Sequence, residues 1–98
     1  MSYYCWPADG ERLAERAREA WTATIEALPL GTSVTGEVIG RQPFGVFLRI
    51  DGAPDAIGLA EVTAMPRNAS LPAVGDTLVG EVMGYTDHNH QVRIRLVG

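Results

Sequence analysis

The side chains best suited to bind a ligand are two phenylalanines and an arginine that lie within six residues of one another. Phe44 and Phe47 are separated by a glycine and a valine, and Arg49 follows two residues later. In an extended strand, alternation places Phe47 and Arg49 on one face and the aliphatic residues on the other. Exposed rings beside an arginine can stack on unpaired nucleobases, whereas the alternative is that both rings belong to the core. The aliphatic face consists of Val46, Leu48 and Ile50.

No other group of residues has the spacing of a catalytic or metal site. His88 and His90 lie in a predicted turn after Asp87 without further ligands nearby, which favours a solvated turn. Cys5 is the only cysteine, which excludes an internal disulfide and fits a reducing compartment. A glycine-rich phosphate loop and a Gly-x-Ser-x-Gly motif are also absent from the sequence. We therefore expect a binding module that is not an enzyme and that uses no metal or other cofactor.

Composition limits the kind of partner. The 98 residues suit a single domain. The formal net charge is −4, and all eight basic side chains are arginines. Duplex-binding proteins usually present a basic face, so any contact with nucleic acid here must be local, dependent on stacking, and weak. No apolar run approaches the roughly 20 residues of a membrane span, and the N-terminus does not resemble a signal peptide. These features predict a cytoplasmic protein without a membrane partner.

The first 28 residues divide into two segments. Residues 1–8 form an aromatic-rich leader from which we expect Trp6 or a tyrosine to pack against the domain. Residues 9–28 are predicted to form one helix, with Asp9 as its N-cap and Pro29 after its end. Its apolar stripe is expected to pack against an open end or flank of the following domain in a monomer, although it could instead form a dimer interface. The stripe consists of Leu13, Ala17, Trp21, Ile25 and Leu28.

From residue 30 onward the sequence is typical of a small β domain. Residues 31–40 and 75–84 share one pattern, a turn glycine followed by a strand with a glycine at which it bends. Such bends are needed to close a small barrel. With a long connection at 65–72, the pattern predicts a mainly β protein: a five-stranded antiparallel OB-type barrel over residues 30–98, preceded by one N-terminal α-helix. The other three predicted strands are 45–50, 56–60 and 91–97.

The order of the motifs in this β segment resembles the S-one RNA-binding domain, the repeat named after ribosomal small-subunit protein one. That family is a five-stranded barrel that binds single-stranded RNA through two rings, a His, an Asp and an Arg. By motif position, the resemblance implies that Phe44 and Phe47 are the rings and that Asp87 is the acidic residue. The motifs that carry it are Phe44-Gly45-Val46-Phe47-Leu48, Gly58-Leu59-x-x-Val62-Thr63 and Gly75-Asp76, in that order.

Several positions depart from the family pattern. Glu61 stands where the family has histidine, and Glu37 and Glu81 stand where lysine is common. Gln91 replaces the arginine that begins the last strand, but Arg93 and Arg95 follow on the same face. With Arg49, these two arginines are the candidate phosphate contacts, and Asp87 would accept a hydrogen bond from a base edge or a 2′-hydroxyl.

Two partners therefore remain open at this point. The first is single-stranded RNA, which would bind weakly through Phe44 and Phe47. The second is a basic protein that would bind an acidic barrel that no longer binds nucleic acid. The carboxylates at positions 37, 61 and 81 motivate this alternative.

Overall fold

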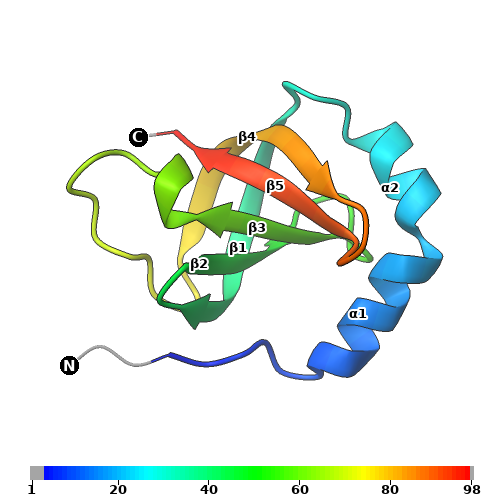
Figure 1. Ribbon diagram of the computed structural model, residues 1–98, viewed down its shortest axis with the longest axis horizontal. Helices are drawn as coiled ribbons and strands as arrows, with labels where there is room; N and C mark the ends of the chain where they lie inside the picture. Colours follow the sequence, from blue (N-terminus) through cyan, green and yellow to red (C-terminus); the bar gives the residue numbers. More distant parts are fainter. Residues whose placement is uncertain (1–3, 98) are drawn as a thin grey trace.

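Alternating apolar residues close the C-terminal two-thirds of the chain into a β-barrel, as seen in a computed structural model that describes residues 4–97 (Figure 1). The first three residues of the predicted leader, and Gly98 at the end of the predicted barrel, lie outside the described residues. A short 3₁₀ helix, η1 (Val62–Ala64), starts the long connection before the fourth strand. The strands are β1 (Ser33–Gln42), β2 (Gly45–Ile50), β3 (Ile57–Glu61), β4 (Thr77–Thr86) and β5 (Gln91–Leu96).

The strands follow the order β1-β2-β3-β5-β4 around the barrel. Four of the pairings are antiparallel, while β3 and β5 close the barrel as a short parallel pair. This arrangement confirms the predicted mainly β, OB-type fold. The barrel interior is aliphatic and includes Val38, Val46, Leu48, Ile50, Val82, Val92 and Ile94.

The two similar segments form equivalent strands. In β1 the register slips between Val38 and Gly40, and in β4 it slips between Val82 and Gly84. An extra residue of this kind bends a strand and increases its twist, which a barrel of this size requires. The shared sequence pattern therefore encodes the same bend in two strands that pair with each other.

The N-terminal segment differs from the single helix predicted over residues 9–28. It forms two helices, α1 (Gly10–Glu19) and α2 (Trp21–Ala27), with Ala20 between them outside helical geometry. Asp9 occupies the predicted N-cap position of α1, and its carbonyl accepts a hydrogen bond from the Leu13 N–H (3.0 Å). Its backbone is left-handed with a φ of 56°, however, and its side chain makes no capping hydrogen bond. Neither helix is long and apolar enough to cross a membrane.

The break between the helices lets the apolar stripe meet two surfaces of the barrel. Leu13 and Ala17 of α1 pack outside the barrel on Ile57 and Leu59 of β3. Farther along the stripe, Trp21 packs against the main core of the barrel. The prediction that this stripe packs against an end or flank of the barrel is thus confirmed. The helices line one side of the barrel in Figure 1.

Candidate nucleic-acid interface

The two predicted stacking rings have different environments. Phe47 lies on the outer face of β2 as alternation predicts, but it is only 6% exposed because α1 covers it. Phe44, at the turn before β2, is 43% exposed. The expectation that both rings are open to solvent is therefore wrong for Phe47, which serves as the platform on which the helix packs.

A third ring joins these two. Trp6 of the leader lies 5.9 Å from Phe47 and 6.3 Å from Phe44 between ring centroids, and the two phenylalanine rings are 5.9 Å apart, edge to face. Trp6 is nevertheless 65% exposed. The exposed aromatic surface at this site is therefore supplied by Trp6 and Phe44.

The leader is held in place by β1. Cys5 and Arg41 exchange two backbone N–H···O=C hydrogen bonds of 2.8 Å. Pro7 packs so closely on Gly40 that a Cβ at position 40 would lie 2.7 Å from the proline Cδ, so only glycine fits. Because its neighbours on both sides are anchored, the Trp6 ring is held beside Phe44 rather than lying in a loose tail.

Arg41 also connects the leader to the long connection before β4. Its Nε donates a hydrogen bond to the carbonyl of Pro72 (2.9 Å), and its Nη2 donates to that of Leu71 (3.2 Å). The guanidinium lies 5.6 Å from the centroid of the Tyr4 ring, within cation–π range. Three segments that are distant in sequence thus meet at one side chain.

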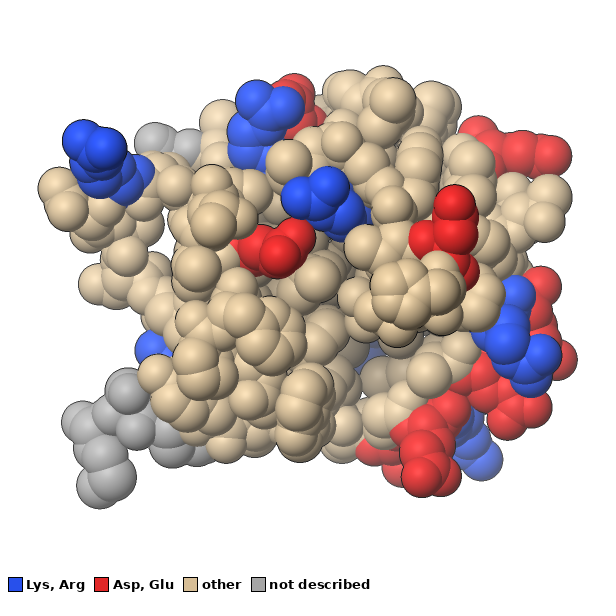
Figure 2. All heavy atoms as spheres, in the orientation of Figure 1, with Lys and Arg blue, Asp and Glu red and all other residues tan. Residues whose placement is uncertain are grey.

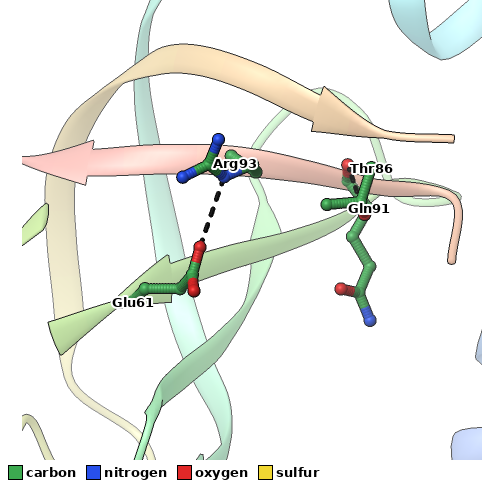
Figure 3. Close-up of polar contacts among 4 residues, drawn as sticks. All are labelled: Glu61, Thr86, Gln91 and Arg93. Carbon is green, nitrogen blue, oxygen red and sulfur yellow. Dashed lines mark hydrogen bonds and ion pairs between the residues drawn. The ribbon is translucent and has the colours of Figure 1, made fainter. Parts of the chain in front are cut away.

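Each arginine proposed as a phosphate contact is paired with one of the three glutamates that depart from the family pattern. In two of the pairs, Arg49–Glu37 and Arg95–Glu81, the residues lie directly opposite each other in antiparallel registers. The third pair joins β5 to the end of β3 (Figure 3). The N···O distances are 2.7 Å for Arg49–Glu37, 3.5 Å for Arg95–Glu81 and 3.3 Å for Arg93–Glu61.

These ion pairs neutralise the positive charge that would attract phosphate groups. On the face shown in Figure 2, positive and negative side chains lie next to one another, and no extended positive area is visible. The carboxylates are therefore partners of the arginines rather than a separate acidic surface. The same pairing also reduces the attraction of this face for a basic protein.

Asp87 is already engaged in a structural contact. One of its carboxylate oxygens accepts a hydrogen bond of 3.2 Å from the indole Nε1 of Trp21. His90 lies edge-on to the same indole, 5.6 Å between centroids. Asp87 therefore fixes the β4–β5 turn against α2, which leaves its second oxygen for any ligand.

Gln91 lies beside the aromatic cluster. Thr86 donates a hydrogen bond to its backbone carbonyl, but its amide side chain has no partner among residues 4–97. Figure 3 shows this side chain directed away from the Arg93–Glu61 pair. It lines an apolar groove of about 280 Å³ together with Trp6, Pro7, Gly10, Leu13, Ala14, Phe47 and Ile57.

The structure thus brings only some of the predicted site residues together. Phe44, Phe47 and Gln91 share the surroundings of Trp6. Arg49 instead lines a groove on the other side of α1, alongside Glu37. Within the described part of the chain, no three His, Cys, Asp or Glu side chains are grouped so as to hold a metal ion.

Sequence reasoning missed Trp6 as a member of this site. The aromatic composition of residues 1–8 indicated that some ring would pack, but it did not indicate where. The backbone pairing of Cys5 with Arg41, 36 positions apart in the numbering, decides the location. A single sequence carries no local signal for such a contact.

Comparisons with known proteins support the fold. No family model matches the chain, and no curated protein matches it either. Among solved structures it is similar to RNase R of Mycoplasma genitalium in its apo form (18% identity, TM-score 0.69) and in complex with ribose-methylated single-stranded RNA (17%, 0.70). Each match covers 92% of this chain and 16% of that enzyme, so the chain spans about a sixth of its length.

A second similar structure is GSP13 from Bacillus subtilis, with 20% identity and a TM-score of 0.57. This match covers 70% of the chain and 55% of GSP13. Together, these similarities support the barrel fold that the sequence motifs implied. At sequence identities of 17–20%, these similarities concern the fold alone.

Proposed function

We propose that this protein binds short single-stranded RNA weakly, with Phe44 as a stacking residue at the end of the barrel next to β2. The observation that carries the proposal is a large exposed ring that lies beside further aromatic rings on an OB barrel. Base–aromatic stacking contributes about 1–3 kcal/mol per base and does not depend on sequence. The similar fold of RNase R, whose structure includes single-stranded RNA, supports the proposal by analogy.

The affinity for RNA is expected to be low because the phosphate groups find little unpaired positive charge on this surface. Arg49, Arg93 and Arg95 each have a glutamate within 4 Å, so binding would release few counterions. Of these three arginines, Arg93 is the one whose partner, Glu61, lies directly opposite Gly45, the residue after Phe44. Stacking rather than charge would then supply most of the binding free energy.

The test is a titration of ¹⁵N-labelled protein with decauridylate RNA at low salt. We expect shifts of amide resonances around Gly45 and Gln91, and Phe44→Ala should weaken binding by about 5- to 150-fold, the equivalent of 1–3 kcal/mol. Val79→Ala is the control, since Val79 is also exposed but lies on β4 beside a different groove. Absence of any shift at millimolar RNA would refute the proposal.

Binding of a basic protein through an acidic barrel has less support. Glu37, Glu61 and Glu81 motivated that alternative, and each of them already contacts an arginine. A basic partner would gain the full electrostatic attraction of these carboxylates only if it displaced the arginines. The titration separates the two candidates, because an acidic protein-binding barrel predicts no response to RNA.

A further inference from the structure

The groove beside Trp6 has the features of a pocket for one flat ring. Its walls come from the leader, the first half of α1 and the strands β2, β3 and β5, and its lining is mostly apolar. A volume of about 280 Å³ is slightly below the roughly 300–1,000 Å³ of ordinary small-molecule sites. The groove is therefore too small for an ordinary small-molecule ligand but large enough for a single planar ring.

Two side chains offer this ring complementary contacts. Trp6 contributes an indole that stays 65% exposed although it touches two other rings. Gln91 contributes an amide with two N–H donors and one carbonyl acceptor, none of them engaged within residues 4–97. A nucleobase has a flat apolar face and an edge of donors and acceptors, which matches this pair.

The spacing of the rings determines how a base could stack. A base inserted between two rings needs about 7 Å, twice the carbon–carbon contact distance. Trp6 and Phe44 are 6.3 Å apart and inclined at 46°, so a base does not fit between them. Stacking must therefore use the solvent-facing side of the Trp6 indole.

We propose that Trp6 and Gln91 form a one-base pocket in which the indole stacks on an unpaired RNA base and the amide hydrogen-bonds its edge. This inference rests on the proposed function and adds that the N-terminal segment supplies part of the binding surface. Phe47, buried beneath Trp6, supports the indole instead of stacking on the base itself. The pocket would accept one base of a strand that also passes Phe44.

The experiment compares four variants in the decauridylate titration, with binding also measured for decacytidylate and decaadenylate. Trp6→Ala should weaken binding about 5- to 150-fold, while Trp6→Phe, which keeps a ring, should stay within a few-fold of the original protein. Gln91→Leu keeps a similar volume without the amide, so it should weaken binding and reduce the difference between the three RNAs. Tyr4→Ala is the matched control, because it removes an exposed leader ring that contacts Arg41 and does not line the groove.

The outcomes separate this inference from the proposed function. If the unmodified protein fails to bind any of the RNAs, the proposed function fails. If Phe44→Ala weakens binding and Trp6→Ala does not, only the one-base pocket is refuted. Tighter binding by Trp6→Ala would show that Trp6 is a lid over Phe47, which also refutes the pocket. Thermal unfolding of each variant confirms that an affinity change is measured on folded protein.

Discussion

Replacing Glu61 with glutamine should strengthen RNA binding, because this substitution removes a negative charge and releases an arginine. Glu61 Oε1 lies 3.3 Å from Arg93 Nε, and the two side chains are 38% and 37% exposed (Figure 3). Glutamine has nearly the same shape, so the backbone of β3 should be unaffected. The guanidinium of Arg93 would then be available to a phosphate passing Phe44.

The size of the effect follows from Coulomb's law. A carboxylate and a phosphate about 7 Å apart repel each other by about 1 kcal/mol at an effective dielectric constant of about 50, halfway between a protein surface and water. Removing that repulsion predicts about fivefold tighter binding at low salt. If Arg93 neutralises one phosphate, the slope of log K against log salt should become steeper by about 0.7.

The cost to folding should be small. Exposed ion pairs contribute about 0.2–1 kcal/mol, and this pair is more than a third exposed. For a domain of this size, 1 kcal/mol corresponds to a change in melting temperature of about 4–8 °C. The variant should therefore remain fully folded during a binding assay at 25 °C.

The assay is fluorescence anisotropy of labelled decauridylate at several salt concentrations. Glu37→Gln is the matched control: it makes the same change in charge and also releases an arginine, but Arg49 lines a groove on the other side of α1. Glu37 lies five residues from Gln42 along β1, about 16 Å from the turn that carries Phe44. If Glu61→Gln binds no more tightly than Glu37→Gln, or leaves the salt slope unchanged, the reasoning is refuted.

Two further substitutions test the contacts that build the site. Gly40→Ala should displace the leader, because the added Cβ would overlap Pro7. Displacement would break the pairing of Cys5 with β1, so the Cys5 thiol should react faster with a disulfide reagent. An unchanged reaction rate would contradict this contact. Phe47→Ala should lower the free energy of unfolding by about 3–5 kcal/mol in urea, as for a buried phenylalanine, whereas Phe44→Ala should cost about 1 kcal/mol or less. Equal losses for the two phenylalanines would contradict their different burial.

The barrel could be predicted from the sequence because its signals are local. Alternation correctly assigned Val46 and Leu48 to the interior and Phe47 to the outer face of β2. The matching glycine patterns of residues 31–40 and 75–84 correctly indicated bent strands. Such periodic patterns depend only on which face of a strand is buried.

The environment of Phe47 could not be predicted in the same way. An outward-facing ring on a barrel strand is exposed or buried according to what packs over it, and here α1 does so. The break at Ala20 that directs α1 onto this face involves no proline or glycine. Tertiary packing overrides local helix propensity at such a position, so a single sequence does not reveal it.

The ion pairs show a second limit of prediction from a single sequence. Glu37 and Arg49 were each recognised in the sequence, one as a carboxylate where lysine is common and the other as a phosphate contact. Their pairing depends on the register of the β1–β2 hairpin, which places them directly opposite each other. Residues considered singly suggested an acidic face with a few basic contacts, whereas the register gives a neutral one.

The position of Arg41 has a consequence for how this small protein loses its structure. Its backbone holds Cys5, and its guanidinium holds the carbonyls of Leu71 and Pro72, so one residue joins the leader and the long connection to β1. Loss of this anchor would release both segments. Both should therefore loosen in the same cooperative step, and amide hydrogen exchange in the two segments should rise together as denaturant is added.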